Sequence, residues 1–206
     1  MRPEGTITRA EAATVFFRLL NDSVRDAYRT SENSFRDVKS SDWFNTAVST
    51  MAAMGIVEGY PDGTFKPNGT VTRAEFAAMA ARFDPDGDAT ATAFAEIYEH
   101  WGRKEINVSA NNGWILGYED GTFKPDETIT RAEAVAMLNR VLQRIPQSKD
   151  DLLPGMITWP DNADPAAWYY LPVQEASNSH DCRRKENGYE EWTRLQEPRK
   201  WSELEK

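Results

Sequence analysis

The chain has 206 residues, of which 40% are hydrophobic and 28% are charged, and its formal net charge is -9. This composition is ordinary for a folded globular protein, and the acidic excess argues against general nucleic-acid binding, which needs a basic face. A single cysteine, Cys182, excludes an intramolecular disulfide and any paired-cysteine metal or redox motif. No apolar stretch reaches the roughly 20 residues of a membrane-spanning helix, so we expect no membrane span.

A self-similar block returns along the chain. The pattern Gly-Tyr-x-Asp-Gly-Thr-Phe-Lys-Pro occupies residues 59–67 and 117–125, and Thr-Arg-Ala-Glu after an apolar residue follows at 71–75 and 129–133. The second part also occurs near the start of the sequence, at 7–11. Such internal repetition predicts a repeat protein, in which each copy buries its apolar face against its neighbours.

The first copy is expected to open a helix at Thr8. In the pattern Thr-x-x-Glu, the threonine hydroxyl caps a free helix N–H group and the glutamate reaches back to the threonine N–H. Apolar residues then recur at helical spacing. They are Ala12, Val15, Phe16, Leu19 and Leu20. We expect this helix to continue to about Tyr28 and to break in the polar stretch 30–34.

A different unit alternates with the capped helices, and we term it the lead-in unit. It begins with Phe-Arg-Asp-Val at 35–38, and its apolar spacing predicts an amphipathic helix that ends at Gly55, a C-cap glycine. The pattern recurs from Phe94 to Gly113, and a third copy has its apolar residues at 173–176. The tryptophans of the three units are Trp43, Trp101 and Trp168.

The rest of the chain completes this alternation. Thr72 and Thr130 each open a further capped helix after an Asp-Gly turn, and Pro146 is expected to end the second of these helices. Asn187-Gly188 predicts a hairpin with a type I′ turn. The charged tail, residues 197–206, is expected to fray.

We therefore predict a mainly α fold, in which three helix–loop–helix repeats close around a pseudo-threefold axis, with short β-hairpin and turn elements. The expected segments are the second half of the first repeat, the second repeat, the third repeat, and a lead-in half-repeat with the hairpin and tail. Their boundaries are 1–30, 31–88, 89–147 and 148–206. The first and last segments would pack together, which gives a monomer with an internal pseudo-trimer.

The arginine of Thr-Arg-Ala-Glu needs a separate explanation. A cation in the first turn of a helix opposes the helix dipole, so an arginine that recurs there in all three copies is locally unfavourable. These arginines are Arg9, Arg73 and Arg131. We interpret them as residues that meet an anionic partner or ligand. The alternative is an ion pair with an acidic residue of the neighbouring repeat.

In this order, the motifs resemble the S-layer homology (SLH) repeat of bacterial cell-surface proteins, over roughly residues 3–180. The resemblance implies an extracellular, non-enzymatic module of the cell wall or S-layer, with any export signal outside these residues. It also implies non-covalent anchoring through a secondary cell-wall polysaccharide, often one that ends in a pyruvylated amino sugar, or through peptidoglycan. No cofactor, metal or catalytic residue is expected.

The resemblance places binding in grooves between adjacent repeats. Besides the three arginines and the three lead-in tryptophans, it assigns to the site the turn residues Gly59, Tyr60, Asp62, Gly63, Gly117, Tyr118, Asp120 and Gly121. The first copy lacks this turn, so we expect the groove around Arg9 to be incomplete and favour Arg73 and Arg131. The two aspartates fit the role of turn residues at least as well, and a tryptophan at a lead-in position is more often a core residue than a ligand platform.

An acidic sugar fits this set of residues. A guanidinium fork holds a carboxylate bidentately, and helix N-terminal N–H groups would add donors. Aromatic rings can pack on the apolar face of a pyranose. The alternative function is a protein–protein assembly module of the surface layer, whose grooves bind acidic protein segments. An enzyme is not expected, since no pair of carboxylates can be placed across one cleft.

Overall fold

A computed structural model describes residues 1–205 of the chain. Over these residues the fold is mainly α with one short β-hairpin, as predicted. The helices are α1 (Arg9–Leu19), α2 (Asp22–Tyr28), α3 (Asn45–Ala53), α4 (Arg73–Ala81), α5 (Arg103–Asn111), α6 (Arg131–Val141), α7 (Tyr170–Ser177) and α8 (Trp201–Leu204). The strands are β1 (His180–Arg184) and β2 (Glu190–Leu195). None of the described helices combines the length and apolarity needed to cross a bilayer.

The three capped helices are α1, α4 and α6, and each begins with the predicted capping box. In α1, the Thr8 hydroxyl accepts a hydrogen bond from the Glu11 N–H at 3.2 Å, and the Glu11 carboxylate accepts one from the Thr8 N–H at 2.9 Å. The lead-in helices α3 and α5 are each followed by a glycine with positive φ, +71° at Gly55 and +69° at Gly113. The predicted C-cap glycines are therefore confirmed.

Two helix ends differ from the prediction. The first helix ends at Leu19 rather than continuing to Tyr28, because the Asn21 side chain accepts a hydrogen bond from the Val24 N–H and caps the separate helix α2. Helix α6 ends at Val141, before Pro146, and Gln143 follows it in the left-handed region with φ of +55°. Leu142, the residue between the end of the helix and Gln143, is 42% exposed.

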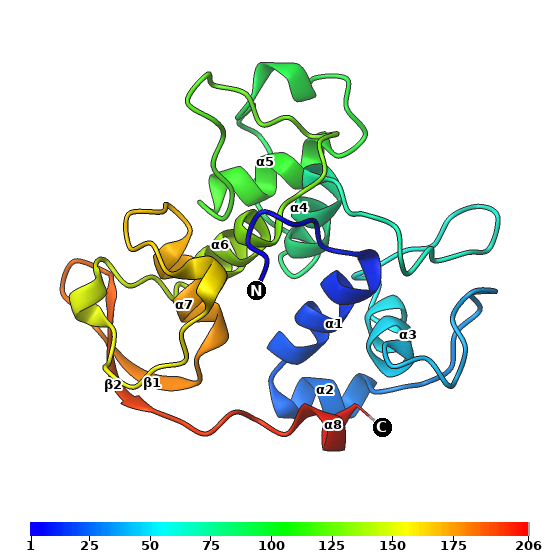
Figure 1. The fold of residues 1–206 in the computed structure, drawn as a ribbon. Coiled ribbons are helices and arrows are strands. Elements are labelled where there is room, and N and C mark those ends of the chain that lie inside the picture. Colours follow the sequence, from blue (N-terminus) through cyan, green and yellow to red (C-terminus); the bar gives the residue numbers. More distant parts are fainter. Residues whose placement is uncertain (206) are drawn as a thin grey trace.

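Each capped helix packs against the lead-in helix that follows it, so the pairs are α1 with α3, α4 with α5, and α6 with α7. In Figure 1 these pairs form three lobes around the N-terminal segment. Fully buried aromatic side chains fill the spaces within and between them. These are Phe16, Phe17, Phe65, Phe76 and Phe123.

Backbone hydrogen bonds join the three lobes into a closed ring. The Arg9 N–H donates to the Gly69 carbonyl in the loop before α4, at 2.9 Å. In the same way, Arg73 donates to Glu127 before α6, and Arg131 donates to Gly5 before α1. Each copy is thus bonded to the next, and the third is bonded to the first. Whether one rotation axis relates all three copies stays a prediction.

The C-terminal hairpin exists, but its turn is not of type I′. Gly188 has φ of +85°, whereas Asn187 is outside the positive-φ region that type I′ also requires. The Lys185 N–H donates to the Tyr189 carbonyl, so the loop is a three-residue turn with glycine in the left-handed position.

The tail does not fray over its described residues. It runs from β2 back to α1 and α2 and ends in α8 (Figure 1). The Trp201 ring lies 5.3 Å from the guanidinium carbons of both Arg18 and Arg25, and Glu205 forms an ion pair with Arg18. Residue 206 of the predicted tail lies outside the described residues.

Candidate functional site

The motif arginines each reach forward to the next copy and bind there in the same way. Arg73 donates from Nε to the Phe123 carbonyl at 2.7 Å and from Nη1 to the Glu133 carboxylate at 2.7 Å. The matching ion pairs are Arg9 with Glu75 at 3.3 Å and Arg131 with Glu11 at 2.9 Å. The acid is in every case the capping-box glutamate of the next copy. The structure therefore has the ion pair that the sequence analysis gave as the alternative.

The N-terminal N–H groups of the capped helices are also occupied. In α4 the Arg73 and Ala74 N–H groups donate to the carbonyls of Glu127 and Pro125, and the Glu75 N–H donates to Thr72. The expectation that these groups would serve an anionic sugar is wrong, because the ring of repeats already uses them.

Each motif arginine reaches forward to the next copy, so the turn that lies beside it belongs to that next copy. Arg9 lies beside Tyr60, whose ring centroid is 4.9 Å from its guanidinium carbon, so the turn of the second copy serves the arginine of the first. Arg131 instead donates to the carbonyl of Met1, which occupies the place of Phe65 and Phe123. The expectation of an incomplete groove around Arg9 is therefore wrong, since the turn of the second copy lies beside that arginine.

A groove of about 500 Å³ lies between the second and third copies, and we call it the Arg140 groove. Four predicted site residues line it, namely Arg73, Gly117, Tyr118 and Trp168. The Trp168 side chain is 60% exposed, so its indole face is free to pack on a ligand. Pockets for small molecules run from about 300 to 1,000 Å³, so this groove has the volume for a sugar residue.

Tyr118 is held rigidly at the wall of this groove. Its hydroxyl donates to the Glu133 carboxylate at 2.8 Å, and its ring centroid lies 4.6 Å from the guanidinium carbon of Arg73 and 4.5 Å from the Lys124 ammonium. Burial and the hydrogen bond to Glu133 raise the pKa of Tyr118 to about 12. The tyrosine therefore stays protonated and keeps its hydrogen bond to Glu133.

Arg140 is the residue of this groove that sequence reasoning missed. Its side chain is half-buried beside Arg73, and within residues 1–205 its guanidinium has no hydrogen-bond or ion-pair partner. Burial and the positive charge of Arg73 both lower the pKa of Arg140. Two exposed acids, Glu4 and Glu119, also line the groove. The sequence pattern that could have revealed Arg140 is an arginine that recurs ten residues after the capping threonine in all three copies.

The equivalent groove between the first and second copies is much smaller, about 140 Å³, and we call it the Arg82 groove. Four predicted site residues line it, namely Arg9, Gly59, Tyr60 and Trp101. Here Arg82 is already paired, since its Nη2 lies 3.0 Å from the Glu58 carboxylate and its Nη1 donates to the Ile56 carbonyl.

The remaining predicted residues build turns or stand apart from these grooves. The Asp62 carboxylate accepts hydrogen bonds from the Thr64 N–H and hydroxyl, at 3.0 and 2.6 Å, and these bonds lower its pKa. Asp120 binds Thr122 identically, and Gly63 and Gly121 supply positive φ. These four residues line neither groove. Trp43 is 60% exposed and also lies outside both.

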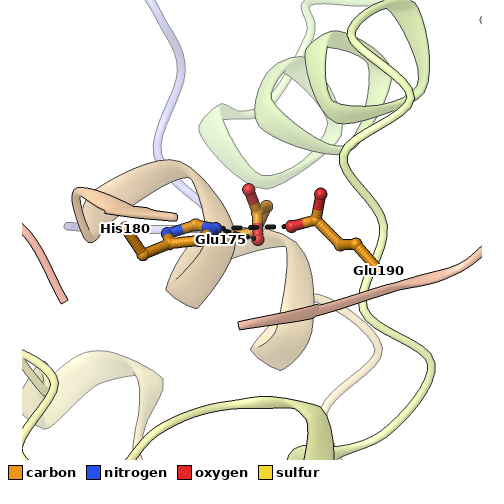
Figure 2. A group of neighbouring side chains, drawn as sticks. All are labelled: Glu175, His180 and Glu190. Atoms are coloured by element: carbon orange, nitrogen blue, oxygen red, sulfur yellow. Dashed lines mark hydrogen bonds and ion pairs between the residues drawn. The ribbon is translucent and has the colours of Figure 1, made fainter. Parts of the chain in front are cut away.

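The third inter-repeat position contains a different arrangement. Its cavity, about 510 Å³, is lined by Arg131 together with Arg144, Glu175 and His180. Figure 2 shows that His180 and two glutamates, Glu175 and Glu190, point toward one another, with possible metal-ligating atoms within 4.8 Å.

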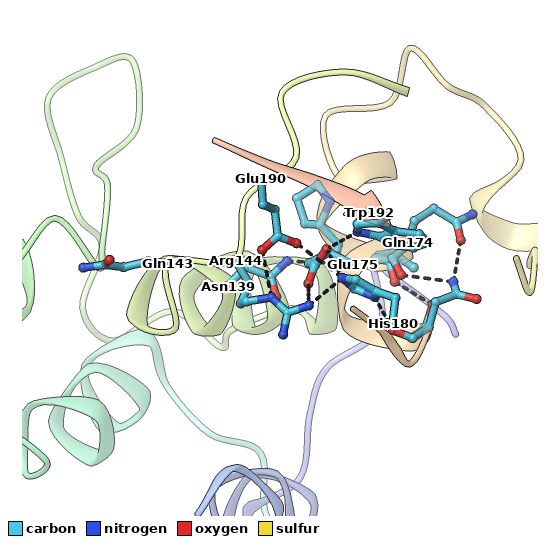
Figure 3. A network of polar contacts seen from close by, with 12 residues as sticks. Asn139, Gln143, Arg144, Gln174, Glu175, His180, Glu190 and Trp192 are labelled. Atoms are coloured by element: carbon cyan, nitrogen blue, oxygen red, sulfur yellow. Dashed lines mark hydrogen bonds and ion pairs between the residues drawn. The ribbon is translucent and has the colours of Figure 1, made fainter. Parts of the chain in front are cut away.

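The guanidinium of Arg144 already supplies the positive charge for this group. It lies 2.8 Å from Glu190 and 3.2 Å from Glu175, and it also contacts the Nε2 atom of His180 (Figure 3). The Trp192 indole N–H donates to Glu175 at 2.7 Å, so the network joins the hairpin to α6 and α7. Burial lowers the pKa of His180, but its hydrogen bond to Glu175 and the charge of Glu175 outweigh burial and raise that pKa overall. We interpret the group as a structural charge network.

Comparison with known proteins gives the following matches. A family model described as the S-layer homology domain matches residues 34–77 and 94–135. A cellulosome-anchoring protein of Acetivibrio thermocellus is 36% identical over 195 residues, which are 92% of this chain and 42% of that protein. The S-layer protein EA1 of Bacillus anthracis is 30% identical over 147 residues, or 66% of this chain and 16% of that protein.

An enzyme is also among the relatives. An amylopullulanase of Thermoanaerobacterium thermosulfurigenes is 34% identical over 151 residues, which are 69% of this chain and 8% of that protein. The chain thus spans less than half the length of each of these relatives.

Proposed function

This chain belongs to the S-layer homology domain family, and from that premise we propose that it anchors a bacterial surface protein to the cell wall without a covalent bond. The names of its relatives, a cellulosome-anchoring protein and S-layer proteins, support a location at the cell surface. We further propose that the ligand is a secondary cell-wall polysaccharide with an acidic terminal sugar, such as a pyruvylated amino sugar. The chain itself is proposed to be non-catalytic.

The observation that carries this proposal is the Arg140 groove. It combines a sugar-sized space, an unpaired guanidinium and an exposed indole within one concave surface. A guanidinium binds a carboxylate through two parallel charge-assisted hydrogen bonds, whereas the indole packs on the C–H face of the ring. Because the motif arginine Arg73 is paired with Glu133, we propose that it builds the wall of the groove and adds to the positive potential there, and that it does not bind the ligand directly.

A second candidate function is binding of acidic protein segments during assembly of the surface layer. One observation favours it, because Glu205 of the C-terminal tail is itself an acidic protein residue bound by a last-turn arginine, Arg18. The volume of the Arg140 groove and its exposed tryptophan favour the saccharide.

A cell-wall pull-down separates the two candidates. Purified walls are offered to the wild-type chain before and after mild acid removal of the pyruvyl ketal. We expect binding that is lost with the ketal and that Trp168→Ala weakens. The matched control is Trp43→Ala, because Trp43 is equally exposed but lines neither inter-repeat groove described above. Equal binding to treated and untreated walls would contradict the acidic sugar.

A further inference from the structure

Every capped helix carries an arginine at an equivalent place at its C-terminal end, within the last turn or at the C-cap, and we call these the last-turn arginines. These residues are Arg18 in α1, Arg82 at the end of α4 and Arg140 in α6. A cation near a helix C-terminus is favoured by the helix dipole, which explains why an arginine is tolerated there. The dipole does not determine which partner the guanidinium takes, and the three copies differ in that respect.

In two copies the guanidinium binds a carboxylate of the chain itself. Arg18 holds Glu205 as a fork, with Nε near one carboxylate oxygen and Nη2 3.1 Å from the other. Arg82 lies 3.0 Å from Glu58. These internal pairs show which chemical group the position accepts, namely a carboxylate approaching the open edge of the guanidinium.

In the third copy, no carboxylate from residues 1–205 pairs with the guanidinium of Arg140. Leu116 stands where the second copy has Glu58, and the leucine side chain cannot pair with a cation. The one described acid of the tail that reaches a last-turn arginine, Glu205, is committed to Arg18. Glu133, which also lines this groove, is bound by Arg73 and Tyr118.

We infer that Arg140 receives the carboxylate of the acidic saccharide, whereas Glu58 and Glu205 are internal occupants of the two equivalent positions. The inference rests on the proposed function and adds a stoichiometry to it, one acidic saccharide for each chain. It also identifies the residue at positions 58 and 116 as specificity-determining. An acid there closes the groove to an external carboxylate, and an apolar residue leaves it open.

The geometry of the two grooves agrees with this assignment. The groove with the unpaired arginine has a volume of about 500 Å³, and the one with the paired arginine about 140 Å³. The Leu116 side chain is 59% exposed and that of Glu58 is 72% exposed, so both can be substituted without disturbing the core. Because Glu58 is so exposed, its pair with Arg82 is modest in strength, and a site opened there is expected to be weaker than the natural one.

Titration calorimetry with two matched probes tests the inference. One probe is a pyruvylated amino sugar, and the other is the acetone ketal of the same sugar, which has a methyl group in place of the carboxylate. We expect the wild-type chain to bind one equivalent of the acidic probe and to bind the neutral probe about tenfold more weakly or worse, a factor that corresponds to about 1.4 kcal/mol. Leu116→Glu should abolish the natural site, and Glu58→Leu should add a second, weaker one.

The double variant Glu58→Leu with Leu116→Glu provides the sharpest control. It exchanges the two side chains without changing net charge, and it should again bind one equivalent of the acidic probe. The bound probe should now quench the fluorescence of Trp101, which lines the Arg82 groove, instead of that of Trp168. Circular dichroism and thermal unfolding establish that each variant is folded.

The failures of the two proposals are distinguishable. A wild-type chain that binds neither the acidic probe nor purified walls would remove the proposed function itself. Wall binding by the wild type together with unchanged binding by a folded Leu116→Glu variant would overturn the role of Arg140 and leave anchoring intact. A single unchanged site in Glu58→Leu would show that Glu58 does not close the second groove.

Discussion

The Arg140 groove and the Arg82 groove are built from the same motif but differ in what they can bind. Both have a motif arginine stacked near a turn tyrosine and bound to the next capping-box glutamate. One groove nevertheless contains an unpaired last-turn arginine, and in the other that arginine is paired with Glu58. The motif residues therefore build the same walls in both grooves, and we infer that a residue outside the motif, Glu58 or Leu116, decides whether a ligand site remains.

The comparison also separates two roles that a cation can have in a repeat protein. Arg9 and Arg73 are buried, with 5% and 7% of their surface exposed, and each joins one copy to the next. Arg82 and Arg140 lie nearer to solvent, and their partners vary between copies. Buried ion pairs are costly to break on one side, while partly exposed cations can exchange partners.

The largest expected effect comes from breaking the frame. Arg73→Ala would remove the cation that is paired with Glu133 and the donor to the carbonyls of Phe123 and Leu116, in a mostly buried site. We expect the free energy of unfolding to fall by about 3–5 kcal/mol, as measured by urea denaturation.

Arg131→Ala is the matched variant for this prediction. Its ion pair with Glu11 is more exposed, at 26% and 30% for the two side chains, so the expected loss is smaller. Equal losses for Arg73→Ala and Arg131→Ala would contradict the conclusion that burial distinguishes the frame positions.

A second expected effect concerns pH and the third inter-repeat position. The pKa of His180 is raised in the folded chain, so its stabilising contribution is fully present below its unfolded value of about 6.5 and is lost as pH rises through the folded value. The charges that face it are Glu175, Glu190 and Arg144. We expect the free energy of unfolding to decrease as pH rises above the unfolded value of about 6.5, since the folded pKa of His180 lies higher.

A histidine variant tests this pH effect. Denaturant titrations at several pH values should show a flatter profile for His180→Gln than for the wild type. If the His180→Gln profile has the same slope as the wild type, protonation of His180 does not contribute to the free energy of unfolding.

A third prediction separates the two grooves at their tyrosines. The Tyr118 hydroxyl donates to Glu133, whereas the Tyr60 hydroxyl has no hydrogen-bond partner among the described residues. Tyr118→Phe should therefore lower the free energy of unfolding by about 1–2 kcal/mol, and Tyr60→Phe should change it by less than about 0.5 kcal/mol. Denaturation of the two variants under identical conditions measures the difference.

The sequence was sufficient to predict the features that depend on local chemistry. A Thr-x-x-Glu pattern satisfies its own helix N-terminus, and all three predicted capping boxes form. The C-cap glycines and the Asp-Gly turns are equally local, since each depends on a positive φ that glycine adopts freely.

Features that depend on distant partners were predicted less well. The direction in which Arg9 and Arg131 reach depends on how the ring closes, and the tail is held by distant contacts such as those of Trp201 and Glu205 with Arg18. Arg140 was missed because its importance comes from the absence of an acid at residue 116, and a motif cannot reveal a missing partner. The assignment of ligand contacts stays a prediction for the experiments above.

The smallest expected effect lies at the rim of the Arg140 groove. Glu119 is exposed there, and its place in the turn of the second copy is taken by Pro61, so the acid repels an incoming carboxylate at the open groove alone. Glu119→Gln should raise the affinity for an acidic sugar by up to about twofold at low salt, and the gain should shrink as salt screens the rim. The matched control is Glu186→Gln, an exposed acid in the distant hairpin loop. An equal gain from both variants would show that overall net charge, and not the rim of this groove, controls binding.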